Sequence, residues 1–171
     1  MMHSWSPGYT QAELDAAQER YCVRFPPDLV ALFLERQPTL GYDWRVEDDR
    51  IRQMLAWPFE MLMFDVEHGS WWLDWGERPA SAGERREVVS QFLGQAPALI
   101  PLYSHRFIPE APRLPGNPVF SMHGFDTIYY GSDIQNYFAR EFGDQRKIAV
   151  GKIGRRIPFW SDLAEDHDKW I

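Results

Sequence analysis

Four polar side chains in the second half of the chain have the types that catalysis or metal binding requires. Ser104 and His105 are adjacent, and His123 and Asp126 follow further along the chain. A hydroxyl, an imidazole and a carboxylate form a hydrolase triad when the hydroxyl bonds the imidazole and the carboxylate orients it. Two imidazoles and a carboxylate are also ligands that zinc accepts. The elements that carry these residues therefore decide between an enzyme and a binding protein.

The surrounding chain has the composition of β-strands. After Pro97, β-branched and aromatic residues take over between Pro and Gly residues. Strands are expected within Ile100–Pro109 and Pro118–Met122, and the latter pairs with Asp126–Tyr130 as a hairpin. The hairpin loop has two residues or four, and a slip of one residue exchanges the two faces of a strand. The side on which its polar residues lie therefore stays open.

The adjacency of Ser104 and His105 disfavours an active site. Neighbouring side chains of a strand point to opposite faces, so these two are not expected to bond each other. No Gly-x-Ser-x-Gly turn surrounds the serine, and neither His-x-x-x-His nor a glycine-rich phosphate loop occurs. We therefore expect no catalytic residues, no metal and no cofactor. A metal held by His105, His123 and Asp126, or a small hydrolase using Ser104, His105 and Asp126, is the alternative.

Composition narrows the classes of partner. The chain has 171 residues, a net charge of −7 and 44% hydrophobic residues. A chain of this size forms a sizeable core, and an acidic chain without a basic cluster is not expected to bind nucleic acid directly. Its one cysteine, Cys22, forms no internal disulfide. Neither a signal peptide nor a long apolar run is apparent, so a cytoplasmic location without membrane contact is expected.

Capping boxes predict where three helices begin. In this motif a hydroxyl and a carboxylate or amide each satisfy a free N–H of the first turn. The motif occurs at Thr10–Glu13, Ser81–Glu84 and Ser132–Gln135. Apolar residues that are expected to point inward follow each box. They are Leu14, Ala17 and Tyr21 after the first, Val88, Val89 and Phe92 after the second, and Ile134, Tyr137, Phe138 and Phe142 after the third.

Prolines delimit the other predicted helices. Pro26 and Pro27 begin a second helix, because proline costs little in a first turn. A third helix begins at Asp48 and is expected to end at Pro58. A fourth short helix is expected from Phe59 to near Gly69. A short strand over Ile148–Ile153 precedes a last helix after Pro158. The residues expected to point inward from that helix are Phe159 or Trp160, Leu163, His167 and Trp170.

This order of elements predicts an α+β fold. Helices come first, strands follow and further helices end the chain, whereas α/β proteins alternate helices and strands. We expect a mainly antiparallel sheet in the C-terminal half, packed by the N-terminal and flanking helices. No repeat or linker divides the chain. Residues 1–171 are therefore expected to form one domain, with a core at about 10–142 and a C-terminal extension at about 148–171.

Tryptophans and acidic residues are the candidate partner contacts. Tryptophan is enriched at binding hot spots and also anchors cores. Of Trp71, Trp72 and Trp75, we expect at least one to be buried and one partly exposed, with Trp75 in the core and Trp71 or Trp72 at an interface. The acidic face of the last helix is either solvated or meets a cationic partner. The candidate contact residues are Trp71, Trp72, Asp74, His105, Arg106, Asp162, Glu165 and Asp166.

Five segments, spread over most of residues 10–142, carry a resemblance to a known superfamily. One, Phe25–Leu29, starts a helix, and another, Trp72–Pro79, has an aromatic-Gly-Pro pattern. The other three are Ile100–Pro109, Pro118–Ser121 and Asp126–Gly131, the last before a helix. Together they resemble the SUKH superfamily, which includes fungal Smi/Knr-type regulators and many bacterial immunity proteins.

The resemblance implies an α+β domain that binds proteins and has no catalytic residues. Bacterial members typically neutralise a cognate toxin, often a nuclease, by direct binding. The expected function is therefore that of an immunity protein that covers its toxin, and acidic charge would speed association with a basic nuclease. A regulatory scaffold that binds a host partner is the alternative within the superfamily. The oligomeric state stays open.

Overall fold

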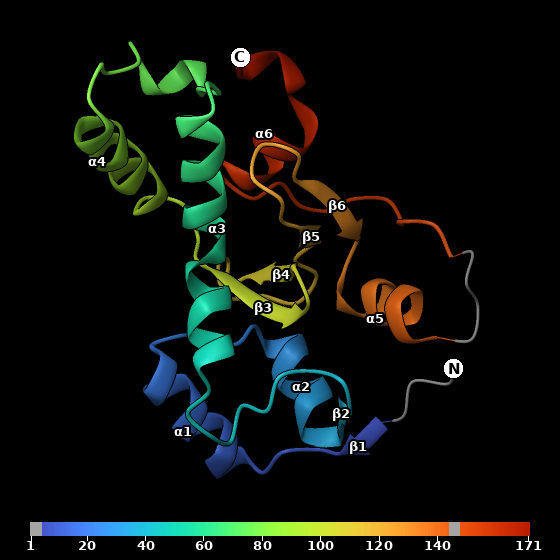
Figure 1. The fold of residues 1–171 in the computed structure, drawn as a ribbon. Coiled ribbons are helices and arrows are strands. Elements are labelled where there is room, and N and C mark those ends of the chain that lie inside the picture. Colours follow the sequence, from blue (N-terminus) through green and yellow to red (C-terminus); the bar gives the residue numbers. More distant parts are fainter. Residues whose placement is uncertain (1–4, 144–147) are drawn as a thin grey trace.

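A four-stranded antiparallel sheet lies at the centre of the molecule, with the strand order β3-β4-β5-β6 (Figure 1). The computed structural model describes residues 5–143 and 148–171. The strands are β3 (Leu99–Tyr103), β4 (Arg106–Pro109), β5 (Val119–Ser121) and β6 (Ile128–Gly131). Each strand pairs with the next along the chain, and helices precede and follow the sheet. The predicted α+β class with an antiparallel sheet is confirmed.

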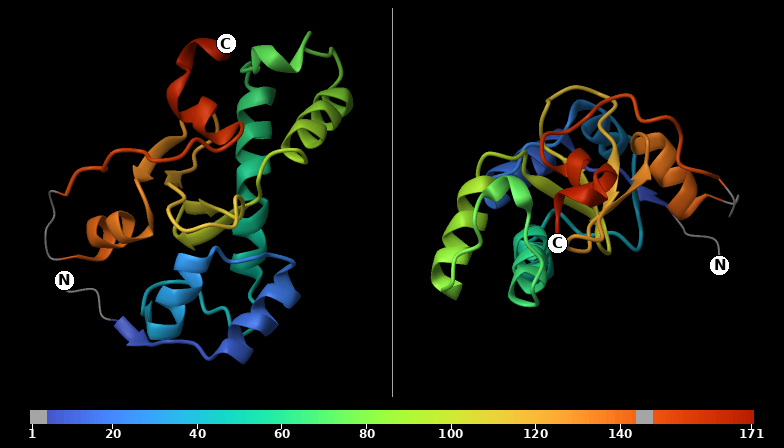
Figure 2. Two further views of the ribbon diagram at one scale, coloured as in Figure 1. Left: turned by 180° about the vertical axis from the view of Figure 1, so that it is seen from behind. Right: turned by 90° about the horizontal axis from the view of Figure 1, so that it is seen from above.

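Helices lie on both sides of this sheet (Figure 2). They are α1 (Gln11–Tyr21), α2 (Pro27–Glu35), α3 (Asp49–Glu67), α4 (Ala82–Leu93), α5 (Ile134–Phe142) and α6 (Trp160–Glu165). A small second sheet pairs β1 (Trp5–Pro7) with β2 (Arg36–Pro38) beside α2. Short 3₁₀ turns cover Leu73–Trp75 and His167–Lys169. None of the helices described is long and apolar enough to cross a membrane.

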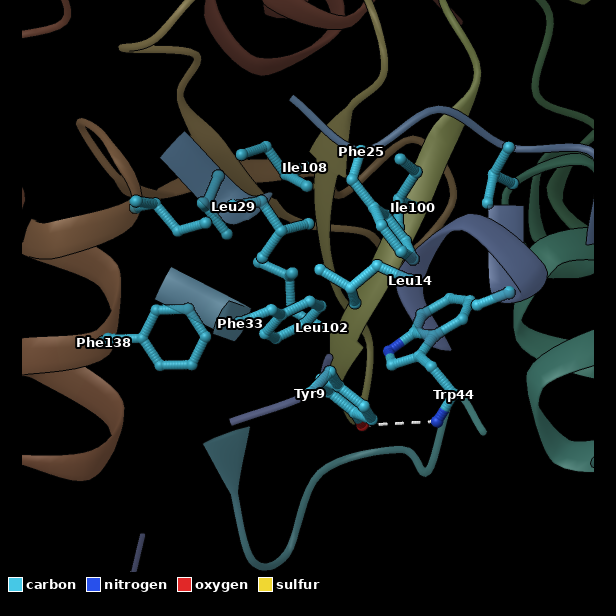
Figure 3. Close-up of a cluster of buried hydrophobic side chains, with 14 of the residues drawn as sticks. Tyr9, Leu14, Phe25, Leu29, Phe33, Trp44, Ile100, Leu102, Ile108 and Phe138 are labelled. Carbon is cyan, nitrogen blue, oxygen red and sulfur yellow. Dashed lines mark hydrogen bonds between the residues drawn. The ribbon is translucent and has the colours of Figure 1, made fainter. Parts of the chain in front are cut away.

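The sheet is buried on both faces because successive side chains of a strand point to opposite sides. Ile100, Leu102 and Ile108 enter a first core with side chains of α1, α2 and α5 (Figure 3). Leu99 and Phe107 enter a second core with side chains of α3, α4 and α6. A sheet covered on both sides needs apolar residues at consecutive positions, which explains the nearly continuous apolar runs of these strands.

Local capping chemistry sets the helix starts, with one correction. Thr10 and Glu13 form the complete predicted capping box of α1. Ser81 accepts the N–H of Glu84 at the start of α4. At α5 the cap is Asp133 rather than Ser132, because the Asp133 carboxylate accepts the N–H of the third helical residue. The predicted cap therefore shifts by one residue, and the Asn136 side chain accepts the Ser132 N–H instead of completing a box.

Helix α3 continues through Pro58, contrary to the break that the sequence predicts. Proline removes one helical donor and disfavours helical geometry at the preceding residue. That residue, Trp57, is held by its indole N–H, which donates to the Met122 carbonyl at 2.9 Å. Pro58 itself is buried. Packing of α3 along both cores thus compensates for the local cost of the proline.

The β5–β6 hairpin forms as predicted, with a longer loop. Ser121 pairs with Ile128, so residues 122–127 connect the strands, rather than the two or four residues expected. The Asp65 carboxylate accepts the Phe125 N–H at 2.8 Å and thereby fixes this loop to α3. A tertiary contact, which no local pattern reveals, sets the loop length.

Residues Ile148–Ile153 form no strand, which corrects the sequence prediction. Side chains of α5 donate hydrogen bonds to backbone carbonyls that strand pairing would otherwise use. Arg140 donates to the Ile148 carbonyl at 2.8 Å, and Asn136 donates to the Ala149 carbonyl at 3.1 Å. This segment therefore follows α5 instead of joining the sheet.

The C-terminal segment packs against the second core. Trp160 and Leu163 are buried as predicted, and the Trp160 indole donates to the Pro97 carbonyl at 2.7 Å. His167 is exposed and lies in a 3₁₀ turn, which corrects its inward assignment. Trp170 pairs its backbone with Trp72. Residues 157–171 thus cover the second core.

Substitution of Leu163 tests whether this segment supports the fold. Leu163→Ala leaves a cavity at a fully buried position. It is expected to lower the free energy of unfolding by about 2–5 kcal/mol in urea denaturation. The matched control is Ile171→Ala, at a side chain that is 70% exposed, with an expected change below about 0.5 kcal/mol. Equal effects of the two substitutions would contradict the assignment of Leu163 to the core.

Candidate functional site

Ser104 and His105 form the turn between β3 and β4. The strands pair as far as Tyr103 and Arg106, which leaves these two residues as the connection. Ser104 has a φ of 49°, a left-handed conformation that non-glycine residues rarely adopt. Its carbonyl accepts a hydrogen bond from the Tyr42 hydroxyl at 2.9 Å. The prediction that strand alternation separates Ser104 from His105 is therefore wrong, because a turn replaces the strand.

The two side chains are as close as a hydrolase requires, but the imidazole donates the hydrogen bond to the hydroxyl instead of accepting it. Ser104 Oγ lies 3.1 Å from His105 Nδ1, and His105 Nε2 lies 2.7 Å from a guanidinium nitrogen of Arg106. Arginine only donates, so Nε2 accepts and the proton of the neutral ring is on Nδ1. Nδ1–H then donates to Ser104 Oγ. A general base must instead accept the serine proton, so His105 cannot activate Ser104 in this arrangement.

Asp126 does not complete a triad. It lies in the β5–β6 loop with an exposed side chain, and its N–H donates to the His123 carbonyl at 3.2 Å. Among the residues described, no hydrogen bond or ion pair joins the Asp126 carboxylate to His105 or His123. The structure therefore brings together Ser104 and His105 but not the carboxylate that would orient the imidazole.

The Arg106 side chain makes most of its contacts within the fold, and its role as a partner contact stays a prediction. Its guanidinium donates to Ser121 Oγ at 2.8 Å and lies 3.7 Å from the ring centre of Tyr130. Its Nε is 3.5 Å from a carboxylate oxygen of Glu141. The two charged side chains are only 15% and 13% exposed. Arg106 thus joins the turn to α5, and it also fixes the tautomer of His105.

His123 and Trp57 extend the surface beside the turn. The His123 ring centre is 6.0 Å from that of His105 and 6.4 Å from that of Trp57, on which it stacks. A hollow of about 360 Å³ adjoins Ser104, with walls from α3, the 40–42 loop and Tyr103. We call Trp57, Ser104, His105 and His123 the turn face.

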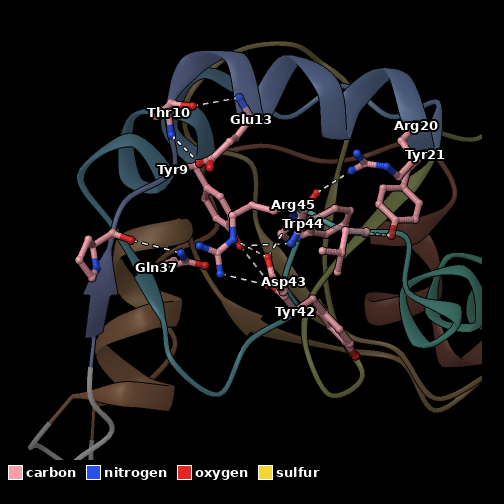
Figure 4. Close-up of polar contacts among 12 residues, drawn as sticks. Tyr9, Thr10, Glu13, Arg20, Tyr21, Gln37, Tyr42, Asp43, Trp44 and Arg45 are labelled. Atoms are coloured by element: carbon pink, nitrogen blue, oxygen red, sulfur yellow. Dashed lines mark hydrogen bonds and ion pairs between the residues drawn. The ribbon is translucent and has the colours of Figure 1, made fainter.

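Hydrogen bonds from Tyr9 position the loop that forms one wall of this hollow (Figure 4). The Tyr9 hydroxyl donates to the Tyr42 carbonyl at 3.1 Å and accepts the Trp44 N–H at 3.3 Å. Burial raises the pKa of Tyr9 to about 12, so the hydroxyl keeps its proton at neutral pH. Tyr42 in turn holds the Ser104 carbonyl, so the loop and the turn are fixed to each other.

The turn face does not have the donors of a metal site. Both ring nitrogens of His105 already have partners, and one of these is the cationic Arg106. Burial, Arg106 and His123 lower the pKa of His105. No group of three metal-ligating side chains occurs in the part of the chain that the structure describes.

Trp71 and Trp72 are both buried, whereas the sequence predicts one of them to be exposed. They are 2% and 3% exposed, and Trp75, assigned to the core, is also buried. Trp71 exchanges two backbone hydrogen bonds with Ile171, and its indole donates to the Gly76 carbonyl at 2.7 Å. The C-terminal segment covers these rings. The expectation that one of the three is partly exposed is therefore wrong.

The acidic residues of the C-terminal region are partly neutralised within the chain. Arg156 pairs with both Asp162 and Glu165. Lys169 Nζ lies 3.7 Å from a carboxylate oxygen of Asp74 and equally far from one of Asp166. All four carboxylates were candidate partner contacts, and each has a cation beside it. This surface is therefore less suited to a cationic partner than the sequence alone suggests.

A groove between α2 and α5 is the surface feature that the sequence analysis missed. It has a volume of about 470 Å³. Its α2 wall has Asp28, Ala31, Leu32 and Glu35, which repeat at helical spacing along one face. The other wall is α5, which presents Phe138, Ala139 and Phe142, and Trp5 lies at the end near β2. The spacing within α2 is visible in the sequence, but only the fold sets α5 opposite to it.

Comparisons with protein-family models, with curated proteins and with solved structures found no match to this chain. The turn face and the groove are therefore interpreted from their own geometry.

The lowered pKa of His105 predicts a pH-dependent contribution to stability. The unfolded chain takes up a proton on this imidazole near the ordinary pKa of 6.5, whereas the folded chain does so at lower pH. The contribution is therefore present above pH 6.5 and is lost as the pH falls through this window. In urea denaturation at about pH 7.5 and about pH 5.5, the wild type is expected to lose more stability than His105→Gln. Parallel losses would contradict this prediction.

Removal of the Glu141 carboxylate tests the structural role of Arg106. Glu141→Ala leaves a largely buried guanidinium without its ion pair and is expected to cost about 3–5 kcal/mol of unfolding free energy. The control is Glu60→Ala, which breaks the exposed pair with Arg86, at an expected cost of about 0.2–1 kcal/mol. Thermal or urea unfolding measures both values. A cost for Glu141→Ala as small as the control would count against this role.

Proposed function

We propose that this chain is a non-catalytic protein-binding module of the SUKH type, an immunity protein that neutralises a cognate bacterial toxin by binding and covering it. The groove between α2 and α5 carries this proposal. One wall begins at the Phe25–Leu29 segment, and the other follows the Asp126–Gly131 segment. Both segments belong to the resemblance with the SUKH superfamily, so the binding surface lies between elements that this resemblance highlights.

The packing of the resembling segments supports the same proposal. Phe25, Ile100 and Val119 come from three segments that are far apart in the sequence, and all three contribute to the first core. Residues that pack in one core must fit one another. Segments that meet in this core are therefore expected to match the pattern of a superfamily as a group. A regulatory scaffold with a host partner uses the same kind of surface and remains the alternative.

A small hydrolase has one specific observation in its favour, the 3.1 Å contact between Ser104 and His105. The direction of that hydrogen bond argues against it, because the imidazole donates to the hydroxyl. Asp126 lies in another loop, and Arg106 occupies the position where a triad carboxylate is needed. A binding function accounts for the turn without requiring these groups to transfer protons.

Protection against a toxin tests the proposal. The chain is co-expressed with each toxin candidate encoded next to its gene, and growth is measured. Full protection is expected from the wild type and also from Ser104→Ala and His105→Gln, because no proton transfer is involved. Calorimetry on the purified pair is expected to give stoichiometric binding.

Two results would contradict this proposal. Failure to protect against any neighbouring toxin would reject immunity. Loss of protection in a folded Ser104→Ala protein, together with substrate turnover by the wild type, would favour the hydrolase.

A further inference from the structure

We propose that the α2–α5 groove binds an amphipathic helix of the protein partner, with basic side chains seven residues apart that pair with Asp28 and Glu35. This inference rests on the proposed binding function and names its surface and the chemistry of its partner.

The walls of the groove have the pattern of a helix-binding surface. On each helix the lining residues recur every three or four positions. They are Asp28, Leu32 and Glu35 on α2, and Ile134, Phe138 and Phe142 on α5, with Phe138 only 6% exposed. Small residues on each helix leave room between them, while Trp5 packs on Phe138 with ring centres 5.5 Å apart. An apolar stripe of a helix, with anchors three and four residues apart, is complementary to such a floor.

The carboxylates on the α2 wall select a helix over a small ligand. Asp28 and Glu35 are seven residues apart on one helix face, which separates them by about 10 Å along the axis. A small ligand needs polar groups that converge on it. These two carboxylates are too far apart to converge, but their spacing matches two side chains seven residues apart on a second helix. The partner is therefore recognised by ion pairs spaced along a helix rather than by polar groups that meet at one site.

The two carboxylates of the α2 wall favour a basic partner. The Asp28 carboxylate accepts the N–H groups of Leu29 and Gly116 at 3.1 and 2.9 Å, which orients it without neutralising it. Glu35 is exposed. Within residues 5–143 and 148–171, neither carboxylate has an ion pair with a cationic side chain. Arg36 also lines the groove, and its guanidinium lies over the Trp5 ring, 4.2 Å from its centre. The lining therefore has two carboxylates and one guanidinium.

A pair of synthetic helices tests the groove directly. One peptide of about 18 residues has a leucine stripe and two lysines seven positions apart, and its match has glutamate at both positions. Fluorescence anisotropy is expected to give about 2- to 30-fold tighter binding of the lysine peptide, since each exposed ion pair contributes about 0.2–1 kcal/mol. Equal affinities, or no binding of either peptide, would overturn the proposal.

Variants on α2 locate the binding. Ala31→Arg fills the groove and is expected to weaken the lysine peptide about tenfold or more. The matched control is Leu34→Arg, at an exposed position of the same helix outside the groove, with unchanged affinity. Glu35→Gln keeps the shape of the groove and is expected to weaken only the lysine peptide, by about twofold. Unchanged binding by Ala31→Arg, with the fold verified by circular dichroism, would overturn the proposal.

Two further measurements separate this inference from the proposed function. If the wild type protects against a toxin and Ala31→Arg protects equally, the groove inference fails while immunity stands. If the lysine peptide binds in the groove but no toxin is neutralised, immunity fails while the groove inference stands. Sedimentation of the protein alone tests a second copy as the occupant. A dimer that Ala31→Arg abolishes would overturn the choice of a basic partner helix.

Discussion

Burial of the central sheet on both of its faces is the constraint on which the rest of this structure depends. Neighbouring residues such as Leu99 and Ile100, or Phe107 and Ile108, enter different cores. Each core must be closed by helices, since apolar surface left in water costs about 25 cal/mol per Å². The N-terminal helices and α5 close the first core. The second is closed only when the C-terminal segment returns to it, which is why α6 is part of the domain.

The same packing sets the direction of the hydrogen bond between Ser104 and His105. Arg106 is held below the turn by Glu141, Ser121 and Tyr130, and it reaches the ring of His105 from within the fold. That contact determines which nitrogen has the proton, and it thereby directs the hydrogen bond toward the serine. The residue types of a catalytic site are present, but a buried cation takes the place of the orienting carboxylate.

The groove illustrates how binding surfaces arise between elements. Neither α2 nor α5 has an unusual face by itself, because each buries an apolar stripe and exposes small and polar residues. Where the two helices lie side by side, the edges of their apolar faces form the groove, which has carboxylates on its α2 wall. The proposed immunity function therefore depends on a surface that neither helix forms alone.

The sequence by itself determined the features that rest on contacts between near neighbours: the α+β order, the antiparallel strands, the cap at Thr10 and the inward residues of α1 and α5. Tertiary structure alone decided the continuity of α3 through Pro58, the burial of Trp71 and Trp72, the contact of Ser104 with His105, and the groove. Each of these depends on residues distant in the chain, such as Met122 for Trp57 and Ile171 for Trp71. Packing energy summed over such contacts exceeds local preferences of about 1 kcal/mol per residue, so local patterns cannot reveal them.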